Sequence, residues 1–269
     1  MSDVPTLITT GLLAYASKDL IKAVLGPTAE YVGQETRGLV QKCNVNLSQV
    51  FSAALRKLQR LGTDPTQPVN LRVFQRVIND AKFAEDQLSQ EYYGGILAAA
   101  KSTDGIDDRG VYYLSLIQAL SAYQLRLHYL IYLTVCRHFR GRPSSYLDRI
   151  DHRDGMKILI PMSLLLRTMV FPDEASKWSY VIHCLAGLSE KQLIGKQSGA
   201  VERKNKDEFS LIGGEGIRTC PTLLGCDVFL WGNGVSTLAG SQIGELMPSQ
   251  IDELFDVSEI VANRQVNVC

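Results

Sequence analysis

Apolar residues recur at helical spacing between Ala29 and Leu61, and this pattern limits the fold more than any other feature of the chain. They follow one another at steps of three, four and seven residues, which places them on one face of an α-helix. The stretch has no proline and stops at Gly62, a common residue at helix ends. The sequence therefore predicts a long amphipathic helix with a buried face, formed by Val40, Leu47, Val50, Phe51, Ala54, Leu55, Leu58 and Leu61.

Shorter helices are expected to follow. The segment 62–70 contains two prolines and is predicted to be a loop. Apolar periodicity then predicts helices over about 71–79, 85–100 and 110–120, with a polar connector over 101–109. Ser121 and Gln124 have the spacing of a capping box, so another helix is predicted to begin there. The first 150 residues are thus expected to form a helical domain.

The second half of the chain has a different pattern. Glycine, proline, serine and mixed charges between Gly141 and Asp154 predict a domain boundary near residue 150. Helices are expected over about 156–169 and 174–186, then a hairpin with strands 200–203 and 208–212, then a helix over about 223–231. A glycine-rich run, Gly213 to Gly216, is predicted to be a hairpin turn. The predicted fold class is mainly α, with a helical domain 1–150, a winged-helix-like α+β domain 151–248 and a tail 249–269.

Composition limits the kinds of partner and the compartment. Lysine plus arginine and aspartate plus glutamate are equal at 28 each, so overall charge does not favour nucleic acid. The six cysteines are scattered, which fits a reducing cytoplasm better than a disulfide framework. The uncharged run Val4 to Ser17 is shorter than the roughly 20 residues of a membrane-spanning helix. We expect a buried or partner-facing helix there, with a membrane-surface helix over Thr6 to Leu25 as the alternative.

Basic residues gather at the end of the helix that begins near Ser121 and in the predicted hairpin. Cations near a helix C-terminus stabilise the helix dipole, which is the simpler explanation for the first group. Contact with phosphate is the alternative, because a winged helix binds nucleic acid through the helix before the hairpin and through the wing. The helix expected over 174–188 offers few side chains that read bases. The candidate phosphate-contacting residues are Arg137, Arg140, Arg142, Lys204 and Lys206, with Lys177, Lys191, Lys196 and Arg203 nearby in the chain.

Acidic residues between positions 85 and 108 raise the question of a metal site, because Mg²⁺ binds converging carboxylates. Helix ends explain them more simply. Glu85 and Asp86 suit a first helical turn, and Asp107 or Asp108 suits the N-cap of the helix containing Val111. A zinc site would need His183, Cys184, Cys220 and Cys226, whose spacing is not that of structural zinc ligands. We therefore predict buried thiols, no metal or cofactor, no catalytic residues and no small-molecule substrate.

Two segments resemble the abortive-infection alpha family of bacterial proteins. They are Leu25-Gly26-Pro27-Thr28-Ala29-Glu30 and, after the long helix, the stretch from Ala84-Glu85-Asp86 through Leu88-Ser89-Gln90-Glu91-Tyr92 to Ile96-Leu97-Ala98. The resemblance covers about Leu25 to Leu133 well and the last third weakly, and Ser89 adds one residue between the leucine and glutamine of the family pattern. It implies a phage-defence role without established catalytic residues. It also implies a structural or interaction motif at Glu85, Asp86, Gln90 and Tyr92.

Together, the residues and the resemblance predict a bacterial phage-defence protein that acts by binding or assembly through an apolar helix surface. The expected partner is another protein or a second copy of the chain. A winged-helix regulator that binds DNA or RNA is the first alternative, and a metal-dependent nuclease that uses Asp107 and Asp108 is the second.

Overall fold

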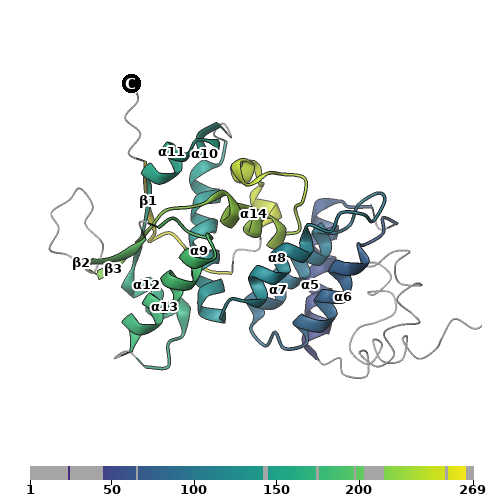
Figure 1. Cartoon of the computed structure of the whole chain (residues 1–269), viewed down its shortest axis with the longest axis horizontal. Helices are drawn as coiled ribbons and strands as arrows, with labels where there is room; N and C mark the ends of the chain where they lie inside the picture. Colours follow the sequence, from purple (N-terminus) through teal and green to yellow (C-terminus); the bar gives the residue numbers. More distant parts are fainter. Residues whose placement is uncertain are drawn as a thin grey trace, which may run out of the picture. The chain divides into compact units, whose positions relative to one another are not determined.

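A computed structural model of the 269-residue chain describes residues 24, 45–64, 66–141, 145–173, 176–196, 198–202, 215–251 and 254–264. The described chain is mainly helical (Figure 1). It divides into two compact units, one formed by residues 1–119 with 230–237 and the other by residues 120–229 with 238–269. This division lies about 30 residues before the boundary predicted near residue 150, and it also places a short late segment in the first unit.

Four consecutive helices build most of the first unit, as the apolar periodicity predicts. They are α5 (Val45–Leu61), α6 (Leu71–Ala81), α7 (Gln87–Ala99) and α8 (Gly110–Gln118). α5 and α7 lie close together because Gly94 has no side chain, and a Cβ there would lie 2.6 Å from the Val50 carbonyl oxygen. The predicted start of the long helix before Val45 lies outside the described residues. So does the Thr6 to Leu25 segment, except for Val24, which is buried.

The end of α14 (Leu223–Gly232) completes the core of the first unit. A Cβ on Gly95 would lie 1.9 Å from the Gly232 carbonyl oxygen, and a Cβ on Gly232 would lie 2.7 Å from the Tyr92 ring. The ring of buried Trp231 lies 4.9 Å from that of Tyr113, centroid to centroid. The two glycines therefore let α14 reach α7 at backbone distance, and Trp231 fills the space beside them.

The second unit is organised around α9 (Ala122–Phe139), which begins at the predicted capping box. The Ser121 side chain accepts from the Gln124 backbone N–H, and the Gln124 side chain accepts from the Ser121 N–H, which confirms the prediction. Most of α9 is buried, and it contacts α12 (Met162–Met169), α13 (Lys177–Glu190) and the 3₁₀ helix η1 (Gly240–Glu245). Two short helices, α10 (Ser145–Asp148) and α11 (Ile150–Gly155), and a second 3₁₀ helix, η2 (Pro248–Gln250), complete the helical part.

A four-stranded antiparallel sheet lies in the second unit, in the order β2-β3-β1-β4, and Figure 1 labels β1, β2 and β3. Its strands are β1 (Met156–Pro161), β2 (Gly199–Glu202), β3 (Glu215–Thr219) and β4 (Val261–Arg264). α12 and α13 follow β1 and precede β2 in the chain. Two segments far apart in sequence, β3 and β4, thus pair with opposite edges of β1.

Two predictions about the second half need correction, and a third falls partly outside the described residues. The helix expected over 156–169 is wrong in its first part, because 156–161 is β1, and a short run of buried apolar residues does not distinguish strand from helix. The turn expected at Gly213 to Gly216 is wrong at Glu215 and Gly216, which begin β3, while Gly213 and Gly214 lie outside the described residues. The strand expected over 208–212 also lies outside them, and the one expected over 200–203 overlaps β2.

Within the described ranges, no helix combines the length and apolar character needed to cross a membrane.

Candidate functional site

Three of the four motif positions at the start of α7 have structural roles. Asp86 is the N-cap of α7, and its carboxylate accepts the Ser89 backbone N–H at 3.1 Å. Gln90 donates from its side-chain amide to the Ala84 carbonyl oxygen at 2.8 Å and so holds the preceding turn. Tyr92 is buried against Gly232. Glu85 is exposed, whereas Asp86 and Gln90 are half-buried.

The neighbouring Glu91, which is not one of the four motif positions, is buried on α7. Its carboxylate forms ion pairs with both Arg56 and Lys57 of α5. The Lys57 side chain is only 1% exposed, and this carboxylate compensates its buried charge. In the sequence, Lys57 lies among the apolar positions of α5, and a lysine at a buried position needs a carboxylate partner. This lysine was the signal that could have identified Glu91.

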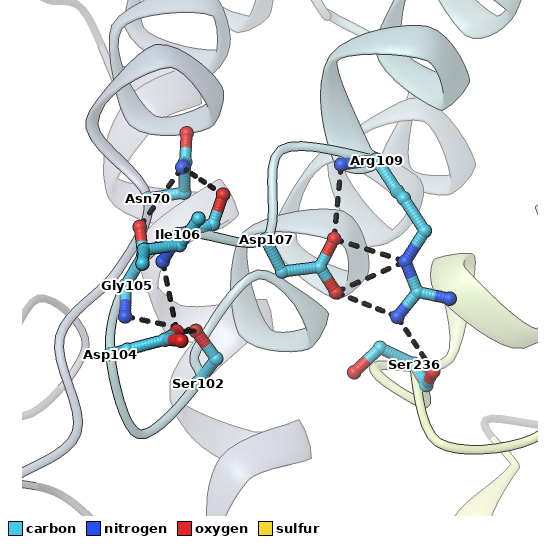
Figure 2. A network of polar contacts seen from close by, with 8 residues as sticks. All are labelled: Asn70, Ser102, Asp104, Gly105, Ile106, Asp107, Arg109 and Ser236. Atoms are coloured by element: carbon cyan, nitrogen blue, oxygen red, sulfur yellow. Dashed lines mark hydrogen bonds and ion pairs between the residues drawn. The ribbon is translucent and has the colours of Figure 1, made fainter.

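A connecting loop at residues 102–109 is held by the Asn70 side chain and by side chains of the loop itself (Figure 2). We refer to it as the 102–109 loop. The Asn70 side-chain amide donates to the carbonyl oxygens of Gly105 (2.9 Å) and Ile106 (3.1 Å). The Asn70 side-chain oxygen simultaneously accepts the Arg72 backbone N–H at 3.0 Å, so one residue caps α6 and fixes the loop. Gly105 has φ +68°, a conformation that favours glycine.

Carboxylates within the loop are engaged by the loop itself. Asp104 accepts the Ile106 backbone N–H at 3.0 Å and the Ser102 hydroxyl at 3.1 Å. Asp107 accepts from the Arg109 guanidinium through Nε (3.0 Å) and Nη2 (2.6 Å). Arg109 also donates to the Ser236 carbonyl oxygen at 3.3 Å, and its guanidinium lies 5.3 Å from the centre of the Trp231 ring. The loop is therefore tied to the late segment of the first unit.

These contacts correct the predicted roles of Asp107 and Asp108. The N-cap of α8 is Arg109, without a side-chain cap, and neither aspartate occupies that position. Asp107 instead accepts the Arg109 backbone N–H (3.1 Å) and its guanidinium, and Asp108 forms an ion pair with Arg72. The Arg109 guanidinium lowers the pKa of the Asp107 carboxyl by hydrogen bonding. Across the described part of the chain, no group of three or more histidine, cysteine, aspartate or glutamate residues could hold a metal ion.

The tip of the loop carries an exposed apolar side chain. Ile106 is 73% exposed although the backbone on both sides of it is hydrogen bonded. The Asp104 carboxylate next to it forms no ion pair with any described residue, and hydrogen bonding from the Ile106 N–H lowers its pKa. The loop therefore presents an apolar group beside a fixed negative charge.

The outer face of α13 is the second exposed feature. Val181, Cys184, Leu185 and Leu188 are buried, whereas the opposite face of the helix is exposed and contains no lysine, arginine, asparagine or glutamine. We call this face the α13 outer stripe: Ser179, Ile182, His183, Ala186 and Glu190.

The nominated phosphate-contacting residues are only partly described. Arg137 is half-buried on α9, and Arg140 is exposed just beyond its end. Arg142, Lys204, Lys206 and the neighbouring Arg203 lie outside the described residues. Three further lysines, Lys177, Lys191 and Lys196, lie at or beyond the ends of α13. The described residues therefore do not test a convergent phosphate site.

The candidate zinc ligands of the second unit do not form a site. Cys184, Cys220 and Cys226 are buried free thiols, as predicted, whereas His183 is exposed beside the Ser121 hydroxyl at 3.3 Å. Burial raises the pKa of the Cys184 thiol to about 12, so this sulfur is protonated at neutral pH.

A buried polar cluster lies where α9 meets the start of α14. His128 is fully buried, and its Nε2 lies 3.1 Å from the Gly225 carbonyl oxygen. Tyr132, one turn further along, donates to the Leu193 carbonyl oxygen and accepts the Thr222 N–H at 3.0 Å. Burial lowers the pKa of His128 to about 3, so the imidazole is neutral in the folded protein. Because both side chains hydrogen bond to backbone groups inside the core, we assign them a structural role.

Comparison of the chain with protein-family models, curated proteins and solved structures found no match, so the resemblance to the abortive-infection alpha family rests on the sequence motifs alone.

Proposed function

We propose that the chain is a bacterial phage-defence protein that acts by binding a protein partner through the 102–109 loop rather than by catalysis. The defence setting comes from the motif resemblance between Leu25 and Leu133. The binding role rests on one observation: Ile106 is held at the exposed tip of a braced loop.

The loop has the properties expected of a contact surface. Its backbone is already ordered by Asn70 and Asp104, so binding would cost little conformational entropy. An exposed apolar residue surrounded by charged groups resembles the centre and rim of a protein interface. The negative charge of Asp104, held beside Ile106 by hydrogen bonds within the loop, favours a partner that places a basic side chain beside an apolar pocket.

A plaque assay tests this proposal directly. Cells with the gene are expected to reduce plaque formation by a sensitive phage, and Ile106→Ser is expected to abolish the reduction at equal protein level. The matched control is Ile150→Ser on α11, because Ile150 is 67% exposed but lies in the second unit. Asp104→Asn should weaken defence partially, since asparagine still accepts the Ile106 N–H but carries no charge.

Two results would reject the proposal in different ways. If the gene protects against none of a broad panel of phages, the defence setting fails. If it protects and Ile106→Ser protects equally, the loop is not the contact surface. Circular dichroism of each purified variant separates a lost contact from a lost fold.

Binding of nucleic acid through a winged helix is the second candidate. It is supported by the chain order β1, α12, α13, β2, β3 and by the strand order β2-β3-β1, which are those of a winged helix with α13 before the hairpin. The α13 outer stripe lacks the arginine, lysine, asparagine or glutamine side chains that read base edges. Fluorescence anisotropy with labelled duplex DNA and RNA at low ionic strength decides between the candidates, and salt-dependent binding would favour this one.

The nuclease alternative has weaker support. Asp107 and Asp108 are paired with Arg109 and Arg72, and both pairs would have to open before a metal ion could bind. Incubation of supercoiled plasmid with the protein and Mg²⁺ or Mn²⁺ tests it. Cleavage that is lost in both Asp107→Ala and Asp108→Ala would revive the nuclease assignment.

A further inference from the structure

The 102–109 loop contains an aspartate followed directly by a glycine, a dipeptide that readily forms isoaspartate. In this reaction the Gly105 amide nitrogen attacks the side-chain carboxyl carbon, Cγ, of Asp104. A five-membered succinimide ring forms and one water molecule leaves. Water then opens the ring at either carbonyl and restores aspartate or yields isoaspartate, in which the main chain runs through Cβ and Cγ. The change is an isomerisation, so it needs no oxidant, reductant or other co-reactant.

The shape of the loop keeps glycine at position 105 and so preserves this dipeptide. Gly105 has φ +68°, and a Cβ there would lie 3.2 Å from the Pro68 Cγ atom. Both features disfavour a larger residue at this position. Asp104, which supplies the other reacting group, is exposed. The reactive pair is therefore part of the turn that presents Ile106.

Hydrogen bonds within the loop engage both reacting groups (Figure 2). The Gly105 N–H donates to the Ser102 hydroxyl oxygen at 3.0 Å. The Ser102 hydroxyl donates to an Asp104 carboxylate oxygen at 3.1 Å, and the Ile106 N–H donates to the same oxygen at 3.0 Å. The bond from Ile106 lowers the pKa of Asp104, which keeps the carboxyl ionised and its oxygen a poor leaving group. Ser102 thus contacts both partners of the bond that must form.

We propose that Asp104 is a site of isoaspartate formation, that the Ser102 hydroxyl restrains the reaction, and that conversion releases the loop. In isoaspartate the former Cγ belongs to the main chain and the free carboxylate is on Cα. The oxygen that accepts the Ile106 N–H is then displaced, so the brace of Ile106 is lost. For the function proposed above, this would remove the contact surface, but the inference itself rests only on the contacts within the loop.

Peptide mapping of the full chain after incubation at neutral pH tests the proposal. Trypsin cleaves after Lys101 and Arg109, so it releases the loop as the single peptide 102–109. A synthetic peptide of the same sequence is the unrestrained reference, and electron-transfer fragmentation locates isoaspartate at Asp104. In the folded chain Asp104 should convert at least about tenfold more slowly than in the peptide, because the loop must open locally before the ring can close.

Substitutions of Ser102 test the restraint. Ser102→Ala should convert at least about fivefold faster than the wild type, the size expected from the loss of one ordinary hydrogen bond. Ser102→Thr keeps the hydroxyl and should remain close to the wild type. Ser115→Ala is the matched control, because it removes a hydroxyl that donates to the Tyr112 carbonyl oxygen at 2.6 Å on α8, outside the loop. A wild-type chain that converts at the rate of the peptide, or a Ser102→Ala chain that converts no faster than the wild type, would overturn the proposal.

A second labile pair in the same unit separates local opening from global unfolding. Asn233 precedes Gly234, is 4% exposed, and the Gly234 N–H donates to the Trp231 carbonyl oxygen at 3.0 Å. Deamidation of Asn233 therefore reports opening of this core, and Ser102→Ala should leave its rate unchanged. If Asp104 converts only in chains whose Asn233 has deamidated, the restraint lies in the global fold and the proposal fails.

Hydrogen exchange tests the release of the loop independently of any partner. The Ile106 amide should exchange faster in aged Ser102→Ala protein that contains isoaspartate than in the fresh variant. The matching fraction of aged and fresh Ser115→Ala protein should exchange alike at this amide. Equal exchange at Ile106 before and after conversion of Asp104 would show that the loop keeps its shape, and would reject this part of the proposal.

Discussion

Acidification is expected to destabilise the second unit through one buried side chain, His128. In the unfolded chain its imidazole should titrate near the ordinary value of 6.5, whereas in the fold burial lowers its pKa to about 3. The unfolded state therefore binds the proton more readily. The contribution of neutral His128 to stability is fully present above about pH 6.5 and is lost progressively as the pH falls toward 3.

The size of this effect follows from the shift. At about 1.36 kcal/mol per pKa unit, the full difference corresponds to about 5 kcal/mol. Between about pH 7.5 and about pH 5 only some 1.5 units of that range are crossed, so the expected loss of unfolding free energy is about 2 kcal/mol. This window is useful because most carboxylates begin to protonate only below it.

Urea denaturation followed by far-ultraviolet circular dichroism at several pH values across this window measures the effect. His128→Gln is the test variant, because its amide can still donate to the Gly225 carbonyl oxygen but does not titrate. Between about pH 7.5 and about pH 5, the unfolding free energy of His128→Gln should fall by about 2 kcal/mol less than that of the wild type. His183→Gln, at an exposed position, serves as the control and should keep the wild-type slope. Parallel pH profiles for the wild type and His128→Gln would refute the reasoning.

Three further substitutions are expected to change stability, and denaturant midpoints measure each one. Gly95→Ala should cost about 2 kcal/mol or more because its Cβ would lie 1.9 Å from the Gly232 carbonyl oxygen, whereas Gly199→Ala, with open space around it, should change stability by less than about 0.5 kcal/mol. Glu91→Gln should cost about 3 kcal/mol because it removes the carboxylate charge that pairs with the buried Lys57 ammonium, and Asp151→Asn, which breaks an exposed pair with Arg149, should be nearly neutral. Ser121→Ala should cost about 1 kcal/mol by removing half of the capping box of α9, and an unchanged midpoint would show that the cap contributes nothing.

Local signals in the sequence were sufficient for the helices of the first unit and for several of their ends. The stripe of α5 and the capping box at Ser121 depend on residues within a few positions of one another, so periodicity and side-chain type identify them. Asp86 was expected to stabilise the start of α7 and does so as its N-cap. These features need no knowledge of distant contacts.

Features that depend on distant residues were missed. β1 reads as a helix because its apolar run is short and continuous, and only its pairing with β3 and β4 makes it a strand. Asp107 and Asp108 satisfy the sequence rule for an N-cap, but Arg109 and Arg72 attract their carboxylates more strongly. The exposure of Ile106 could not be foreseen, because the brace comes partly from Asn70, which lies more than thirty residues earlier. The exposed face of α13 was not predicted either, because it can be identified only when the residues of the buried face are known.

The late segment 230–237 in the core of the first unit also affects synthesis of the protein. A ribosome that has completed residue 119 must still add 118 residues before this core is whole. At about 5 to 20 residues per second, that interval lasts roughly 6 to 24 s. During it, the surfaces of α7 and α8 that later contact Gly232 and Trp231 have no covering. A fragment ending at residue 119 would leave those surfaces of α7 and α8 exposed permanently, so we expect it to aggregate or bind chaperones. A chain that extends to residue 237 contains Gly232 and Trp231, which cover them.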